Sequence, residues 1–68
     1  MTLQLDVRGY SCPEPVIRLK RVIGSHDAID LTVDNQTSAD VCKRFAESKG
    51  FSVSVHRADN DYVLEIRK

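Results

Sequence analysis

The stretch LQLDVRGYSCPEPVIRLKRVIG, residues 3–24, changes its hydrophobic period partway along. Its first six residues alternate apolar and polar side chains, which is the pattern of a β-strand with one dry face and one wet face. Beyond the turn, apolar residues recur every three or four positions, at Val16, Leu19, Val22 and Ile23. That spacing indicates the buried face of an α-helix, and Gly24 stands where a C-cap glycine would end it. The sequence therefore predicts a strand followed directly by a helix.

The same two-residue alternation recurs in three later stretches, residues 29–34, 51–56 and 62–67. Residues 58–61, Ala-Asp-Asn-Asp, form a polar segment between the last two and predict a turn. Because all four predicted strands have one apolar face only, we expect a sheet that is covered on one side and wet on the other.

A second helix is predicted from about Ser38 to Lys49, with apolar residues along one face and Gly50 as its stop. Thr37 or Ser38 can cap its start. The order is therefore β-α-β-α-β-β, and right-handed crossovers place both helices on the same face of the sheet. We predict one α/β (α+β) two-layer sandwich domain spanning residues 1–68. The residues expected in its core are Leu5, Ile29, Leu31, Phe45, Val53, Leu64 and Ile66.

Composition narrows the class of protein. The 68 residues contain ten Lys plus Arg and ten Asp plus Glu, without the basic excess of a typical nucleic-acid binder. No apolar run approaches the ~18 residues of a membrane span, and the first residues do not resemble a signal peptide. We therefore expect a soluble cytoplasmic protein that binds neither membrane nor nucleic acid directly. Its two cysteines and two histidines lack zinc spacing, so we expect no metal and no cofactor.

Cys12 is placed unusually, directly before Pro13 and close to Pro15. Prolines are tolerated in the first turn of a helix, where the N–H groups have no intrahelical acceptor, and they would hold the thiol rigidly at the helix start. The helix dipole would lower the thiol pKa from ~8.5 by roughly one unit at most. Glu14 opposes that shift, and an ion pair from Glu14 to Arg18 would weaken the opposition. An exposed thiol without a neighbouring base or a C-x-x-C partner suits carrying a group.

Cys42 differs from Cys12, since it follows Val41 on the apolar side of the second helix. We expect it at the edge of the core and assign it no part in the chemistry.

The segment LDVRGYSCPEPV resembles the Asp-x-Arg-Gly-x-x-Cys-Pro-x-Pro signature of the TusA-like (SirA-like) sulfur-carrier family. The matching positions are Asp6, Arg8, Gly9, Cys12, Pro13 and Pro15. Residues 33–53, VDNQTSADVCKRFAESKGFSV, also resemble this family, and particularly the N-terminal domain of the YedF type associated with selenium metabolism. The likeness covers nearly the whole chain.

The resemblance implies a mixed sheet with strand order 1-2-4-3, in which the fourth strand is antiparallel to the others. It implies that Cys12 accepts sulfur as a persulfide from a cysteine desulfurase or rhodanese-like donor and passes it to an acceptor protein. Asp6, Arg8, Gly9, Pro13, Glu14 and Pro15 would support that cysteine. The pathway served would be tRNA thiolation, a selenium-linked route or another branch of sulfur trafficking.

Arg18, Lys20 and Arg21 concentrate positive charge on the first helix. We interpret them as a docking face for partner proteins, although an ordinary solvated helix face has the same composition. The alternative function is a small regulatory or nucleic-acid-binding module, because fold alone does not fix function. The balanced total charge and the lack of aromatic residues on the wet face of the sheet disfavour it. A third hypothesis is that the sequence is one domain of a longer chain.

Overall fold

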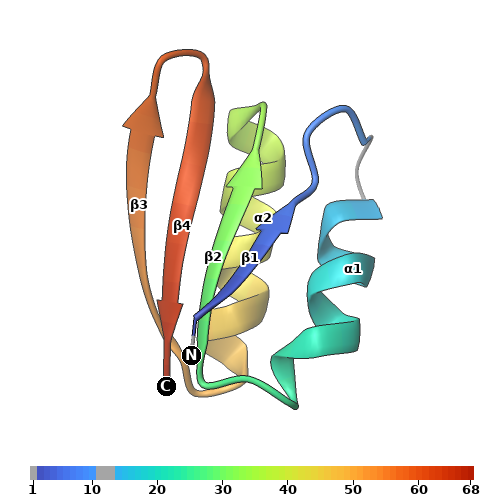
Figure 1. Cartoon of the computed structure of the whole chain (residues 1–68), viewed down its shortest axis with the longest axis vertical. Coiled ribbons are helices and arrows are strands. Elements are labelled where there is room, and N and C mark those ends of the chain that lie inside the picture. The colour runs from blue at the N-terminus through green and yellow to red at the C-terminus, as the bar shows by residue number, and fades with distance from the viewer. Residues whose placement is uncertain (1, 11–13) are drawn as a thin grey trace.

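A computed structural model describes residues 2–10 and 14–68 of the chain. In this part of the chain the helices and strands follow the predicted order β-α-β-α-β-β (Figure 1). Their bounds are β1 Leu3–Asp6, α1 Glu14–Ile23, β2 Ala28–Val33, α2 Gln36–Ser48, β3 Ser52–Ala58 and β4 Asp61–Arg67. The polar segment predicted as a turn joins β3 to β4, with Asp59 in the left-handed region at φ 57°.

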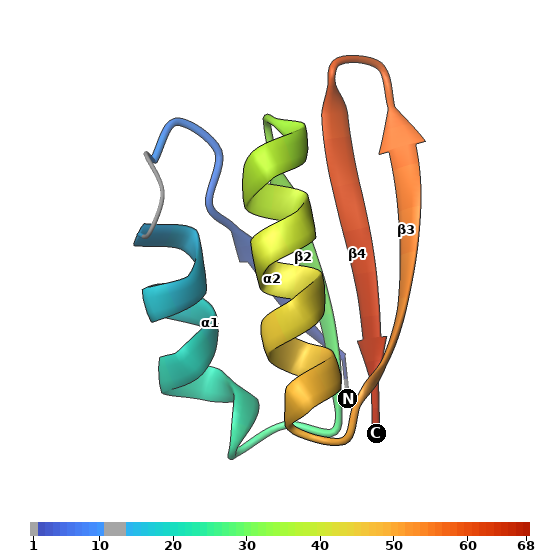
Figure 2. The ribbon, with the colours of Figure 1, turned by 180° about the vertical axis from the view of Figure 1, so that it is seen from behind.

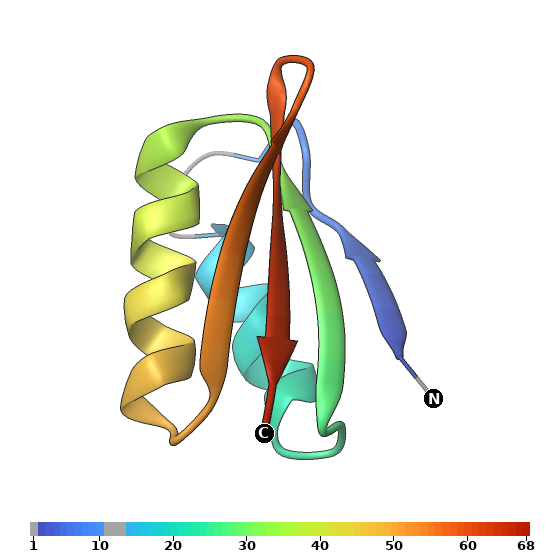
Figure 3. The same cartoon turned by 90° about the vertical axis from the view of Figure 1, so that its left-hand side faces the viewer.

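The strands form one sheet in the order β1-β2-β4-β3. β1 runs parallel to β2, and β4 is antiparallel to both of its neighbours. Figures 2 and 3 show both helices on the same face of this sheet, while the other face is uncovered. The predicted fold class, strand order and helix placement are therefore confirmed.

The core centres on the two middle strands. Ile29 and Leu31 of β2 lie opposite Ile66 and Leu64 of β4, and all four side chains are fully buried. These four residues confirm the centre of the predicted core.

The other three predicted core residues, Leu5, Phe45 and Val53, are only partly buried against it. Leu5 and Val53 belong to the two edge strands, which have a neighbour on one side only. The alternation over residues 51–56 predicted that Val55 faces the helices and is buried. This prediction is wrong, because Val55 on the edge strand β3 is 42% exposed. The helix layer thus covers the middle of the sheet better than its edges.

The ends of the helices correct two expectations. Asn35, not Thr37 or Ser38, caps α2: its side-chain oxygen accepts a hydrogen bond from the Ser38 N–H at 2.8 Å. Asn is among the best N-cap residues, and the helix consequently starts earlier than the apolar pattern indicated. Gly24 follows α1 without a left-handed φ, so it does not act as the expected C-cap glycine.

The end of α2 at Gly50 is as predicted. Gly50 has φ +90°, and its N–H donates to the Glu47 carbonyl at 3.0 Å. The Phe51 N–H donates to the Ala46 carbonyl at 3.1 Å, which completes a Schellman motif. The positive φ explains why a glycine stands there.

Cys42 lies deeper than expected. It is fully buried within the core rather than at its edge. It shares the inner face of α2 with Ser38 and Ala46, one turn away on either side, and both are buried as well.

Substituting Leu31 by Asp should unfold the protein, because an unpaired buried charge costs several kcal/mol against a total stability of about 5–15 kcal/mol. Ser52→Asp is the matched control, since Ser52 is exposed and lies opposite Arg67. Urea denaturation followed by circular dichroism measures both variants. A Leu31→Asp protein as stable as Ser52→Asp would contradict the assigned core face.

Candidate functional site

The Asp-x-Arg-Gly-x-x-Cys-Pro-x-Pro motif, residues 6–15, connects β1 to α1. It starts at the end of the sheet where β1 and β2 both terminate. Its central residues 11–13, including the predicted sulfur-bearing Cys12 and Pro13, lie outside the described residues. The two flanks of the motif are described, and they show how the chain is held on either side.

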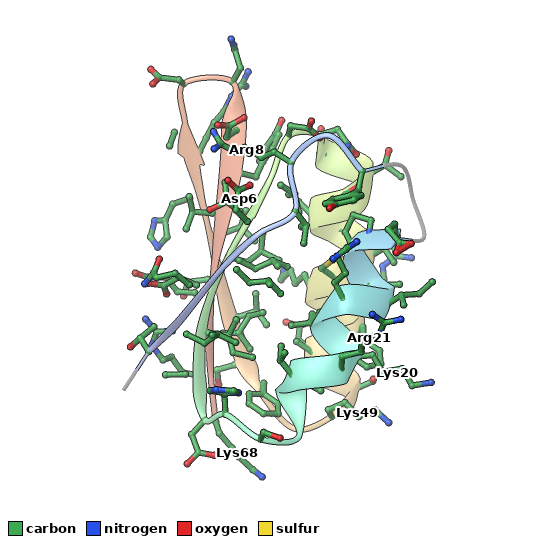
Figure 4. All side chains as sticks on the ribbon, turned by 45° about the vertical axis from the view of Figure 1, so that its right-hand side comes forward. Asp6, Arg8, Lys20, Arg21, Lys49 and Lys68 are labelled. Carbon is green, nitrogen blue, oxygen red and sulfur yellow. The ribbon has the colours of Figure 1, made fainter. Side chains whose placement is uncertain are left out.

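On the upstream flank, Arg8 binds two carboxylates. Its Nη2 donates to Asp6 Oδ2 at 2.7 Å and its Nε to Asp6 Oδ1 at 2.9 Å, a two-pronged contact. Its Nη1 donates to Asp61 Oδ2 at 3.1 Å, at the first residue of β4. Figure 4 shows Asp6 and Arg8 together at this end of the sheet. Arg8 therefore ties the end of β1 to the start of β4.

Gly9 makes the second tie. It has φ +83°, a conformation that favours glycine, and its N–H donates to Asp34 Oδ2 at 2.8 Å. Asp34 directly follows β2, and its other oxygen accepts from the Asn35 side chain at 3.0 Å. The turn after β1 is thereby attached to the junction of β2 and α2.

These contacts shift the acidities of the groups involved. Hydrogen bonds from the Arg8 side chain and backbone lower the pKa of Asp6 to about 2. The pKa of Arg8 is raised, chiefly by its hydrogen bond to Asp6. The pKa of Asp34 is lowered, first by the Gly9 N–H and then by Asn35. Both carboxylates are therefore charged at neutral pH and hold the turn as anions.

An open depression of about 550 Å³ lies over this end of the sheet. The residues that line it are Asp6, Arg8, Gly9, Tyr10, Asp34 and Asp61. Its carboxylates already accept hydrogen bonds from Arg8, Gly9 or Asn35. An open depression whose charged groups are already bound suits contact with another protein surface better than enclosure of a small substrate.

On the downstream flank, Glu14 begins α1 and pairs with Arg18 at 3.8 Å, which confirms the predicted ion pair. The Arg18 guanidinium also lies 4.1 Å from the centre of the Tyr10 ring. This cation–π contact links the segment before the motif cysteine to the helix after it.

Pro15 has a role that its position in the sequence did not reveal. Its side chain is fully buried in the first turn of α1. We interpreted it only as a residue that stiffens the helix start, but its ring is also removed from water there.

The remaining predicted docking residues, Lys20 and Arg21, are exposed in the last turn of α1. Figure 4 shows them far along the helix from Asp6 and Arg8. The structure therefore brings Asp6, Arg8 and Gly9 together at one end and leaves Lys20 and Arg21 toward the other.

Sequence reasoning missed Asp34, Asp61 and Tyr10 as contacts of the motif flanks. A signal existed for Asp34, because the carboxyl ends of neighbouring parallel strands meet at one edge of the sheet. No local pattern indicated Asp61, which is 53 positions away from Arg8.

Comparison with known proteins defines the class. The model of the TusA family, described as sulfurtransferase TusA, matches residues 3–68. The chain belongs to the TusA family. It is also similar to the crystal structure of a SirA-like protein from Desulfitobacterium hafniense, with 28% sequence identity and a TM-score of 0.82. That match covers 97% of this chain and 96% of the other. A search of curated proteins finds no match.

Membership in this family implies a sulfur-carrier or sulfurtransferase role and, in general terms, interaction with sulfur-donor and sulfur-acceptor proteins. Neither of the helices in the described part of the chain is long and apolar enough to cross a membrane.

Replacing Arg8 by Ala should raise the pKa of Asp6 from about 2 toward its ordinary value of ~3.9, since the largest cause of its lowering is removed. In the unaltered protein the folded-state pKa lies below the unfolded one. The Asp6 contact therefore contributes to stability above pH ~4, and that contribution is lost as the pH falls through about 2. A carboxyl-carbon NMR titration measures the pKa. Arg18→Ala is the control that should leave Asp6 unchanged; an equal shift in both variants would contradict the assignment to Arg8.

Pro15→Ala should destabilise the fold by about 2 kcal/mol, because it removes two buried ring carbons and frees the unfolded chain. Lys20→Ala on the same helix is the control, since Lys20 is exposed and should change stability by less than about 0.5 kcal/mol. Urea unfolding measures both. Equal stability of Pro15→Ala and the unaltered protein would show that the proline only stiffens the chain.

Proposed function

We propose that this protein carries sulfur as a persulfide on Cys12. It accepts the sulfur from a cysteine desulfurase or rhodanese-like donor and relays it to an acceptor protein. The proposal is supported by the family match over residues 3–68 together with the Asp-x-Arg-Gly-x-x-Cys-Pro-x-Pro motif that this range contains.

The transfer step is a thiol–persulfide exchange. The Cys12 thiolate attacks the outer sulfur of the donor persulfide, a new S–S bond forms, and the donor leaves as a thiolate. The acceptor thiolate later attacks the outer sulfur on Cys12 in the same way. Each step makes one S–S bond and breaks one, so no external oxidant or reductant is needed.

The anchored flanks add a structural argument to the family match. Arg8 is held by Asp6 and Asp61, Gly9 is held by Asp34, and Pro15 is buried after the motif. A carrier that serves two partners in turn gains from a fixed scaffold, because little ordering remains to be done at each encounter.

The start of α1 adds an electrostatic argument. Cys12 stands two residues before the first helical residue, Glu14, and a helix N-terminus favours a neighbouring anion by about 0.3–1 kcal/mol. A persulfide is more acidic than its thiol, so the loaded form is the better anion there. The Glu14–Arg18 pair offsets the like charge that would oppose it.

We assign partner recognition to the exposed face of α1. Arg18 already binds Glu14 and the Tyr10 ring, so Lys20 and Arg21 supply the charge that is available to a partner. A reducing cytoplasm would keep the thiol available, and the sulfur delivered would serve tRNA thiolation or a selenium-linked pathway.

Incubation with a cysteine desulfurase and cysteine should add the mass of one sulfur atom to the protein, and reductant should remove it. Cys12→Ser should abolish this gain because the carrier atom is lost. Cys42→Ser is the matched control and should retain it, since Cys42 is fully buried. Intact-mass spectrometry measures all three proteins. Reducible sulfur on the Cys12→Ser protein would refute the assignment.

A further inference from the structure

Four cationic side chains gather at the end of the molecule opposite the motif: Lys20, Arg21, Lys49 and Lys68. Lys20 and Arg21 occupy the last turn of α1, Lys49 is the C-cap of α2, and Lys68 follows β4. Figures 1 and 2 show the ends of these three elements at the same end of the molecule, away from the turn between β1 and α1. In Figure 4 the four side chains point outward. We call these four residues the basic end.

The charges of the basic end are not neutralised by the chain itself. Four other cations, Arg8, Arg18, Lys43 and Arg67, pair with carboxylates. Within residues 2–10 and 14–68, none of the four at the basic end has a carboxylate within ion-pair distance.

Two of these cations are placed by aromatic rings. Lys49 lies 5.6 Å from the centre of the Phe45 ring, and Lys68 lies 5.7 Å from that of Phe51. Such contacts orient an ammonium group without cancelling its charge. The total charge is zero, yet four unpaired cations lie at this end, beside the exposed Asp27, whose carbonyl accepts from the Lys68 N–H at 2.9 Å.

An apolar residue adjoins these cations. Ile17 is 39% exposed and shares a face of α1 with Lys20 and Arg21, three and four positions later. Cations at helix C-termini also stabilise the helix dipole, which accounts for Lys20, Arg21 and Lys49. It does not account for Lys68 at the end of a strand or for the exposed Ile17. An apolar contact bordered by cations suits a protein interface.

We propose that the basic end docks an acidic segment of a partner protein in the sulfur relay and leaves the motif end uncovered. The inference rests on the proposed carrier function, whose partner it describes. The ten residues of α1 separate the two ends by about 15 Å. A partner held at the basic end could therefore stay bound while Cys12 exchanges sulfur with a second protein.

Other occupants fit the charges less well. A second copy of this chain offers no acidic segment, because Asp6, Asp34 and Asp61 already accept hydrogen bonds. The exposed carboxylates that make no ion pair among the described residues, Asp27, Asp40 and Asp59, stand singly on three different segments. Nucleic acid and anionic membranes favour a larger basic excess than four cations on a chain of zero net charge. An acidic protein segment needs only complementary charges at one edge.

The first test titrates a twelve-residue Glu- and Leu-rich helical peptide into ¹⁵N-labelled protein at low ionic strength. Amide shifts are expected at residues 17–23, 49–51 and 68. Lys49→Glu should weaken binding about five- to tenfold, corresponding to about 1–1.4 kcal/mol. Arg57→Glu is the matched control, because Arg57 also lies over a ring, that of Tyr62 at 5.7 Å, but belongs to β3. It should change affinity less than twofold; equal loss in both variants, or shifts confined to other regions, would overturn the proposal.

The second test measures alkylation of Cys12 by iodoacetamide at saturating peptide. An unchanged rate supports docking away from the motif, and a drop of fivefold or more overturns it. An RNA hairpin and vesicles containing phosphatidylserine are titrated in parallel. Tighter binding of either through Lys49, or a dimer that Lys49→Glu abolishes, would assign the surface to that occupant instead.

The sulfur-mass assay on Lys49→Glu, loaded from inorganic polysulfide, separates this inference from the proposed function. Uptake should equal that of the unaltered protein. Failure of both proteins to take up sulfur refutes the carrier function, and with it the relay on which the docking proposal rests. Normal uptake combined with no peptide binding refutes the docking surface alone.

Discussion

The pairing of β2 with β4 is the constraint on which the other elements depend. Ile29 and Leu31 meet Ile66 and Leu64 across this pair, and their complete burial requires both helices on one face. β2 also pairs with β1, so the same strand that centres the core fixes where the motif begins. A loss of this pairing would remove both the core and the position of the site.

The site follows from strand direction. β1 and β2 are parallel, so the turn after β1 and the residue after β2 meet, and Gly9 can donate to Asp34. β4 runs the opposite way and begins at the same end, which brings Asp61 within reach of Arg8. Polar residues at or just beyond the ends of three strands thus hold the upstream flank of the motif.

The charge distribution adds a second level of organisation. Asp6, Asp34 and Asp61 at the motif end are bound by Arg8, by the Gly9 N–H or by Asn35, whereas the cations of the basic end have no carboxylate partner in the described part of the chain. A net charge of zero therefore coexists with a group of unpaired cations at the end opposite the motif. For a carrier that visits more than one protein, these ends can serve different contacts.

The sequence by itself determined the element order, the one-sided sheet, the central core residues and the motif with its Glu14–Arg18 pair. It did so because hydrophobic periodicity, turn residues and contacts four positions apart are local properties. Only the tertiary structure decided that Pro15 and Cys42 are core residues, that Val55 stays exposed, and that Asp34 and Asp61 hold the motif flank. These features depend on which strands become neighbours and on how far the helices extend over them. Because such contacts join residues far apart in the sequence, no local hydrophobic period predicts them.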